Sequence, residues 1–267
     1  MHNSFFKSTD GAIPEALNVP IRPSMDQSAQ HLRRIVSALP EAFLPSERPS
    51  PLPDASLYLT EKATTGQLGM CFQDSAIGLI ELTDALAEIT EFVEIVGCFD
   101  VNCLSITSQT ASRINVVPLL CRKAPAHSDM PRAASAPMEL AVQEAAINAL
   151  THGNLGLKSA FDEAGDDIEK YLQIVRTQAV SKPFKTKRID FLLWEKENAV
   201  FVMVRDQGVG YRPPDRRQSE LKVPQKEDRR RVADRRQSGR GLDIIKQFSD
   251  GFWITPPGTS IVMRFKK

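Results

Sequence analysis

Three short segments, which follow one another in the second half of the chain, restrict its fold more than any other feature. Residues 144–154 read EAAINALTHGN, residues 206–210 read DQGVG, and residues 238–245 read SGRGLDII. The first segment has the apolar spacing of a partly buried helix, the second ends an apolar strand, and the third opens a short helix. Each segment alone is a weak signal, but their common order predicts one binding site.

On the first helix, Glu144 and Asn148 are one turn apart and His152 is one turn further, so the three side chains share a stripe. A carboxamide oxygen is a hard, neutral ligand that suits Mg²⁺. A carboxylate one turn away can accept a proton from a hydroxyl near that metal. The spacing therefore predicts a metal ligand at Asn148 and a base at Glu144, and a solvated polar stripe is the alternative.

The second segment begins with Asp206, which ends the apolar run VFVMVRD. A carboxylate at a strand end can accept a hydrogen bond from an exocyclic amine. Gly208 and Gly210 follow at alternate positions, where the lack of a Cβ lets the backbone approach a flat ring. An ordinary turn is the alternative interpretation of this pattern.

The third segment places Gly239, Arg240 and Gly241 at a helix start that continues with Leu242. Free backbone N–H groups in the first turn of a helix favour an anion such as a phosphate. The GxxxxGK[ST] spacing of a P-loop and the GxGxxG of a dinucleotide site are both missing. A metal ligand, a ring-facing turn and a phosphate-facing helix start together predict that the chain binds ATP with Mg²⁺.

Four segments, EAAINALTHGN, DQGVGY, SGRGLDIIKQFSD and GTSIVMRF, resemble the ATP-binding boxes of the GHKL superfamily. The resemblance is greatest to bacterial anti-sigma serine kinases of the RsbW and SpoIIAB type, and it covers residues 138–267. It implies an α+β fold, a two-layer α/β sandwich with a mixed sheet, preceded here by an extra N-terminal region. It also implies ATP and Mg²⁺ as cofactors.

The resemblance implies a role for each matching residue. Asn148 is similar to the Mg²⁺ ligand, Glu144 to the base for a partner serine, and Asp206 to the acid that reads adenine. The remaining nucleotide contacts that it implies are His152, Gly208, Gly210, Gly239, Arg240, Gly241, Leu242 and Thr259.

The leading functional hypothesis is an ATP-binding regulatory serine/threonine protein kinase that phosphorylates a small protein partner. The resemblance suggests an anti-anti-sigma-like substrate, a sigma factor or another signalling protein as partner, and a homodimer as a possible assembly. One alternative is a non-catalytic, ATP-gated protein-binding module. Another is a histidine kinase, for which His31 and His127 are poor phosphoacceptor candidates. A DNA-acting ATPase would need a further transducer domain, and the sequence ends at Lys267.

The expected organisation has four parts. Residues 1–55 are proline-rich and form a mostly flexible arm, and residues 56–125 form an α/β region of unknown role. Residues 126–137 form a linker, and residues 138–267 form the ATP-binding domain. Its lid, residues 211–238, contains ten Lys or Arg and five Asp or Glu, and it contacts phosphates, docks an acidic partner or is simply a solvated loop.

Periodicity gives the expected elements. In the first half we expect helices at Met25–Leu39 and Asp74–Val96 and weak strands at Gly66–Phe72 and Ile114–Leu120. In the second half we expect helices at Met138–His152, Phe161–Ser181 and Leu242–Phe248, a hairpin of Arg188–Glu195 and Ala199–Asp206, and a closing strand at Thr259–Phe265.

Composition excludes some classes of protein. The net charge of +1 argues neither for nor against nucleic acid, and no direct nucleic-acid contact is expected. No apolar stretch approaches the ~20 residues of a membrane span, and the N-terminus lacks the apolar core of a signal peptide, so we expect a cytoplasmic protein without a membrane partner. The four scattered cysteines lack metal-site spacing and are expected to be buried apolar residues.

Overall fold

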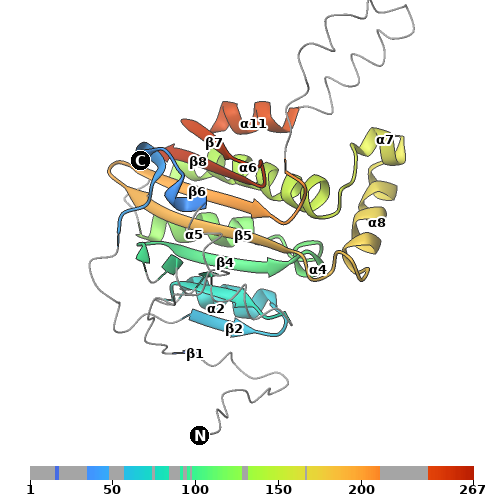
Figure 1. Cartoon of the computed structure of the whole chain (residues 1–267), viewed down its shortest axis with the longest axis horizontal. Helices are drawn as coiled ribbons and strands as arrows, with labels where there is room; N and C mark the ends of the chain where they lie inside the picture. The colour runs from blue at the N-terminus through green and yellow to red at the C-terminus, as the bar shows by residue number, and fades with distance from the viewer. Residues whose placement is uncertain are drawn as a thin grey trace, which may run out of the picture.

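A computed structural model describes residues 16–17, 35–47, 57–73, 76–83, 91–92, 95–96, 98–127, 132–165, 167–210 and 240–267. Its strands form one mixed sheet of eight strands in the order β1-β2-β3-β4-β5-β6-β8-β7. Helices pack against the sheet, which runs from the N-terminal region to the last residues of the chain (Figure 1). The expected α+β class and mixed sheet are confirmed.

The antiparallel half of the sheet carries the site. Strand β5, Arg188–Lys196, pairs with β6, Ala199–Asp206, and β8, Ser260–Lys266, lies between β6 and the edge strand β7, Gly251–Thr255. The β5–β6 hairpin turns where Glu197 has a φ of 52°. This hairpin agrees with the sequence prediction, because both strands are rich in β-branched and aromatic residues.

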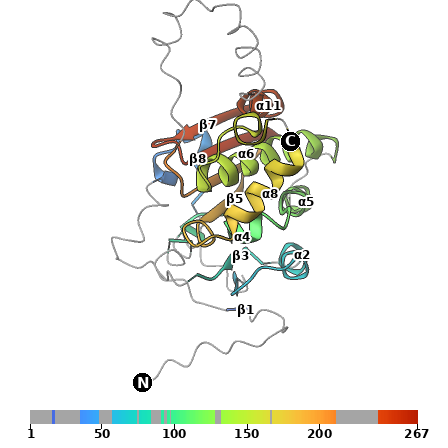
Figure 2. The ribbon, with the colours of Figure 1, turned by 90° about the vertical axis from the view of Figure 1, so that its right-hand side faces the viewer.

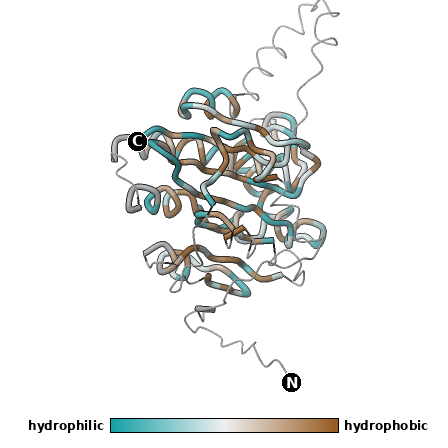
Figure 3. Tube along the Cα trace, turned by 60° about the vertical axis from the view of Figure 1, so that its left-hand side comes forward, coloured by the Kyte–Doolittle hydropathy of each residue, from teal (hydrophilic) through white to brown (hydrophobic). Residues whose placement is uncertain are grey.

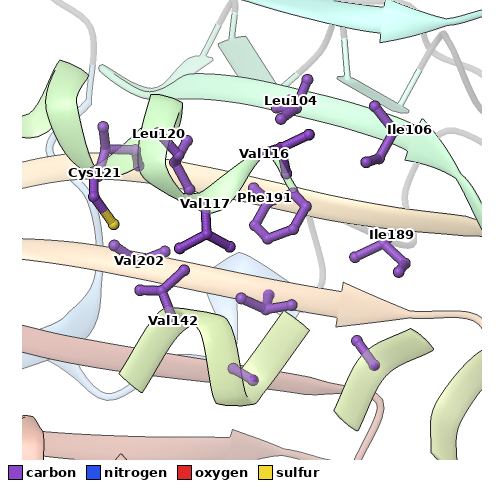
Figure 4. Packing of buried hydrophobic residues seen from close by; sticks show 14 of the residues in the cluster. Leu104, Ile106, Val116, Val117, Leu120, Cys121, Val142, Ile189, Phe191 and Val202 are labelled. Atoms are coloured by element: carbon purple, nitrogen blue, oxygen red, sulfur yellow. The ribbon is translucent and has the colours of Figure 1, made fainter. Parts of the chain in front are cut away.

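One face of the sheet is covered by helices. Helix α6, Arg132–Asn148, ends in the π-helical turn η3, Ala149–Asn154, and packs beside α11, Arg240–Phe248, and α5, Val117–His127. Apolar side chains from β4, β5, β6, α5 and α6 interdigitate between these layers (Figure 4). The hydrophobic stretches accordingly concentrate along the central strands (Figure 3). This layer fixes α6 over the end of β6.

The opposite face of the sheet carries a second hydrophobic core. Strand side chains such as Trp194 and Phe201 stack there, 5.5 Å apart, and Phe43 meets Phe201 edge-on. Residues 35–44 and parts of 91–99 supply the other side of this core. Residues 35–44, coloured blue, therefore lie on the face of the sheet opposite α2, α5 and α6 (Figure 2). The resemblance implies two layers, a sheet and helices on one face. In this chain the other face of the sheet is covered as well.

The N-terminal region extends the sheet. Strand β2, Leu57–Thr60, and β3, Gly78–Glu81, run parallel to β4, Asn102–Thr107, and α2, Thr65–Gln73, connects β2 to β3. Strand β1, Ala16–Leu17, pairs antiparallel with β2, and the 3₁₀ turn η2 spans Glu41–Phe43. Since β4 pairs directly with β5, the N-terminal strands and the ATP-binding segments share one sheet.

Two strand predictions in the first half are wrong, and one helix prediction is wrong in part. Strand β3 replaces part of the helix predicted at Asp74–Val96, because its four residues are all buried and such a strand has no amphipathic period. Residues 91–92 and 95–96 of that prediction are helical, and residues 74–75, 84–90 and 93–94 lie outside the described part of the chain. Helix α2 replaces the strand predicted at Gly66–Phe72, and α5 replaces most of the strand at Ile114–Leu120. Pro118 lies in the first turn of α5, where a missing N–H has no cost.

The segment expected to be a linker, 126–137, is helical at all of its described residues, and residues 128–131 lie outside the described part of the chain. Helix α5 continues to His127, and α6 begins at Arg132 and includes Pro137. The alanine-rich composition of this stretch favours helix more than its prolines oppose it. Of the helix predicted at Met25–Leu39, residues 35–37 are helical and residues 25–34 lie outside the described part of the chain.

After η3 the chain forms α7, Ala160–Ala164, and α8, Ile168–Ala179, where one helix was predicted, and the short α4, Ser108–Ala111, follows β4. Asp167 accepts a hydrogen bond from the Lys170 backbone N–H and so caps a separate helix. No helix in the described part of the chain is long and apolar enough to cross a membrane. The lid, 211–238, lies outside the described residues.

Candidate functional site

A cavity of about 280 Å³ lies where α6, η3, α11 and the ends of β6, β7 and β8 meet. Among these elements, α6 with η3, the end of β6, and α11 carry residues of the three segments 144–154, 206–210 and 238–245. The cavity is lined by Ala145, Asn148, Ala149, His152, Gly153, Val204, Asp206, Gly210, Gly241, Leu242, Ile245, Ile254, Gly258, Thr259, Ser260 and Ile261. Polar groups thus converge on a largely apolar pocket, as in small-molecule sites.

The α6 side of the cavity brings together the predicted base and the predicted metal ligand. The Asn148 Nδ2 donates a hydrogen bond to Glu144 Oε1 over 3.2 Å, and both side chains are half-buried. The start of α11 touches this pair, since a Cβ on Gly241 would lie closer than 3.0 Å to Glu144 Oε1 and Asn148 Nδ2. Glycine at this position lets the helix start approach the carboxylate and the carboxamide.

Asp206 lies at the end of β6 and faces the same cavity. Its Oδ1 accepts a hydrogen bond of 2.7 Å from the Gly208 N–H, and its own N–H donates to the Thr259 carbonyl over 2.9 Å. Burial raises the pKa of the Asp206 carboxyl from 3.8 to about 6, against the lowering effect of the Gly208 hydrogen bond. The carboxylate is therefore held in place, and its charged form is poorly solvated.

The turn that follows β6 is packed without room for side chains. A Cβ on Gly208 would lie closer than 3.0 Å to the backbone of Gly153, and one on Gly210 would meet the Pro257 carbonyl oxygen. Gly210 also has a φ of +81°, which side-chain-bearing residues rarely adopt. The two glycines are thus required by contacts with η3 and with the β7–β8 turn.

The end of η3 is tied to the turn after Asp206. The Asn154 side chain is fully buried and donates to Ser108 Oγ and to the Arg188 carbonyl, both over 2.9 Å, while its Oδ1 accepts from the Gln207 N–H over 2.8 Å. A Cβ on Gly153 would lie closer than 3.0 Å to the Asp206 carboxyl atoms. From the sequence alone, Gly153 and Asn154 are expected only to end the helix.

The other predicted nucleotide contacts lie in different places relative to the cavity. His152 and Thr259 line the cavity, and the His152 Nδ1 lies 2.7 Å from the Leu157 carbonyl, so this nitrogen carries the proton. Leu242 lines the α11 side. Arg240 begins α11, and Gly239 lies outside the described residues.

Behind the site, a buried ionic cluster crosses the sheet on the face opposite α6. Arg205, next to Asp206, donates through Nε to Asp190 Oδ2 over 2.7 Å and lies 3.3 Å from Glu91 Oε2. Asp190 also accepts from Ser105 Oγ over 2.5 Å. These charges raise the pKa of Arg205 although burial opposes them. Glu91 belongs to the N-terminal region, so this cluster joins that region to the strand of the site.

Comparison with protein families identifies the architecture around this cavity. The model of the histidine kinase-like ATPase domain matches residues 108–265, which is more than half of the chain and includes every residue of the cavity. The chain belongs to the histidine kinase-like ATPase domain family. No curated protein matches the chain in sequence.

The histidine kinase-like ATPase domain is an ATP-binding, kinase-like domain of the GHKL type. The match begins at residue 108, well before the expected domain start at residue 138. Domains of this type bind ATP together with Mg²⁺, and the donor set here fits that pair. The described residues include no cluster of three His, Cys, Asp or Glu for a protein-only metal site. A single amide oxygen beside the start of a helix instead suits Mg²⁺, which takes much of its shell from phosphates and water.

Proposed function

We propose that this chain is an ATP-dependent regulatory serine/threonine protein kinase that phosphorylates a small protein partner. The observation that carries the proposal is the contact of the Glu144 carboxylate with both Asn148 and the first turn of α11. A metal ligand and the start of a helix are enough to bind ATP, and the carboxylate beside them adds a group that can accept a proton. A base at that point suits attack by a hydroxyl.

In the proposed complex, Asp206 accepts a hydrogen bond from the adenine amine in the apolar part of the cavity. The backbone N–H groups at the start of α11 face the phosphates, where the helix dipole favours negative charge. The Asn148 side-chain oxygen would hold Mg²⁺, because the Asn148 nitrogen is the atom that faces Glu144. Bound Mg²⁺ supplies charge neutralisation at the phosphates.

The transfer step follows from these positions. The Glu144 carboxylate accepts the proton of the partner's serine or threonine hydroxyl, whose oxygen forms a bond to the γ-phosphorus. The bond from that phosphorus to the β,γ-bridging oxygen breaks, and ADP leaves with the electron pair. The products are the phosphorylated partner and ADP. Most of the rate enhancement in such reactions comes from positioning and charge stabilisation.

The resemblance to anti-sigma serine kinases supports an anti-anti-sigma-like protein, a sigma factor or another signalling protein as partner, and a homodimer as the assembly. A non-catalytic, ATP-gated binding module is the second candidate. It is favoured by the buried contact between Arg205 and Glu91, which links the strand of the site to the N-terminal region. In that case the nucleotide changes the affinity for a partner without transferring phosphate.

One experiment separates these functions. The wild-type chain is used to capture partners from the native cell with and without Mg-ATP, and each captured protein is then tested for phosphorylation. Glu144→Gln is expected to keep ATP affinity within about twofold and to lower transfer at least about a hundredfold, the lower end of a general base contribution. Glu139→Gln, on the same helix but outside the cavity, is the matched control and is expected to transfer normally. Unchanged transfer by Glu144→Gln would overturn the role of the base.

A further inference from the structure

The side chain of Asn154 has an unusual position for a polar group at a helix end. It is fully buried, and both hydrogens of its amide are used, one by Ser108 Oγ and one by the Arg188 carbonyl. Its oxygen accepts from the Gln207 N–H. One carboxamide thereby joins the starts of α4 and β5 to the turn that follows β6. A residue that only ended a helix would need none of these three bonds.

These bonds end next to Asp206. Gln207 directly follows it, and the Gln207 side-chain oxygen accepts a hydrogen bond of 2.9 Å from the Arg188 N–H. Asn154 and Gln207 therefore form a closed ring of bonds with the start of β5. The backbone on the C-terminal side of Asp206 is held from two directions by buried groups.

Gly153, which precedes Asn154 in η3, packs against the side chain of Asp206. Gly153 lies so close that a Cβ there would overlap the carboxyl group. On the far side, the Gly208 N–H donates to Oδ1. The carboxylate is thus enclosed between Gly153 and the turn, and the position of η3 relative to that turn depends on the Asn154 bonds. Moving η3 or the turn would move the carboxylate.

We propose that Asn154 is a positioning residue for base recognition, which sets the preference of the site for a nucleotide with an exocyclic amine by holding Asp206 in place. This inference rests on the proposed role of Asp206 as the acid that reads adenine. Asn154 is not among the residues that line the cavity. Its effect reaches the base through Gln207 and Gly153.

Loss of the carboxamide removes one hydrogen bond from the part-buried Gln207 N–H and one from the buried Arg188 carbonyl. Buried polar groups that lose a partner shift toward water or toward another group. Such a shift changes the direction of the Asp206 carboxylate by more than it changes the apolar walls formed by Val204 and Ile261. Without the Asn154 carboxamide, the part of the ATP affinity that comes from the adenine amine therefore falls more than the part that comes from the ring and the phosphates.

The test compares ATP with purine riboside triphosphate, which lacks the exocyclic amine, by isothermal titration calorimetry in the presence of Mg²⁺. The wild-type chain is expected to prefer ATP by about tenfold or more, the value of a well-made hydrogen bond in a buried site. Asn154→Ala is expected to lower ATP affinity about tenfold and analogue affinity less than threefold. Its preference for ATP thus largely disappears.

Two further variants separate positioning from general destabilisation. Asn115→Ala is the matched control, because the Asn115 Oδ1 also accepts a backbone N–H at a helix start, that of Val117, but lies outside the cavity. It is expected to keep the wild-type preference even if its melting temperature falls. Ser108→Ala removes one acceptor of the Asn154 amide and carries the test if Asn154→Ala fails to fold. It is expected to lower the preference in the same direction by a smaller factor.

The outcomes distinguish this inference from the function on which it rests. If the wild-type chain binds neither nucleotide or binds both equally, the role of Asp206 fails and the inference fails with it. If the wild-type chain prefers ATP and Asn154→Ala, or Ser108→Ala in its place, keeps the full preference, only the inference is overturned. A reduced preference in these variants, with Asn115→Ala unchanged, supports it.

Discussion

The contact between Gly153 and Asp206 predicts that Gly153→Ala lowers the stability of the chain, its ATP affinity, or both. Gly153 is part of η3 and has no positive φ, so alanine fits its backbone. The added Cβ would nevertheless lie closer than 3.0 Å to all three atoms of the Asp206 carboxyl group. Either the carboxylate moves away or the strained contact stays in the folded state.

The magnitude follows from the cost of placing a methyl group in an occupied space, about 1–3 kcal/mol. If Asp206 stays in place, this cost lowers the free energy of unfolding. If Asp206 rotates away, the cost appears as weaker ATP binding, about 5- to 150-fold. The loss of unfolding free energy and the loss of ATP-binding free energy should therefore sum to at least about 1 kcal/mol.

The assay combines urea unfolding with calorimetric titration of Mg-ATP. Gly69→Ala is the matched control, because it lies inside α2 and a Cβ there would meet nothing within 4 Å. This control should gain about 0.5–1 kcal/mol of stability from the better helix propensity of alanine, and it should bind ATP normally. If Gly153→Ala keeps both wild-type stability and wild-type ATP affinity, the inferred contact between η3 and the Asp206 carboxylate is refuted.

Three further predictions concern charge and burial. Because burial raises the pKa of Asp206 from 3.8 to about 6, this carboxyl group is protonated more in the folded chain than in the unfolded chain between these values. The contribution of Asp206 to the free energy of unfolding should fall as pH rises through this window, and Asp206→Asn should remove that contribution in urea titrations. Wild-type ATP affinity should drop below about pH 6 as the acceptor is protonated. Asp190→Ala should cost about 3–5 kcal/mol in urea unfolding, since it leaves the buried Arg205 without its closest carboxylate, and a cost below 1 kcal/mol would contradict this. Native alkylation followed by mass spectrometry should label Cys98 first, because the other three cysteines are buried and burial raises the pKa of two of them; fast labelling of any buried thiol would contradict the packing.

The elements that the sequence predicted well have strong local signals. Strand β6 has the predicted bounds, Ala199–Asp206, because a run of β-branched and aromatic residues ends in Asp and Gly. Helix α11 begins two residues before the predicted start. The pairing of Glu144 with Asn148 was also predictable, since one helical turn separates them.

Features that depend on distant parts of the chain were not predictable from local patterns. Strand β3 is buried on both faces and has no period of two, so its pattern does not distinguish it from the helix predicted there. The bond from Gln207 to Asn154 joins residues 53 apart in the sequence, so no local pattern indicates it. The second core, on the face of the sheet opposite α6, likewise needs contacts between the N-terminal region and β5, β6 and β8.

The most direct test of the central claim is hydrogen–deuterium exchange with and without Mg-ATP, because it locates the nucleotide on the chain. ATP in the cavity should slow exchange in three segments at once, residues 145–153, 206–210 and 254–261, and at the start of α11. Helix α2, which is remote from the cavity, should exchange at an unchanged rate. Protection confined to other segments, or none at saturating Mg-ATP, would contradict the assignment of this cavity as the ATP site.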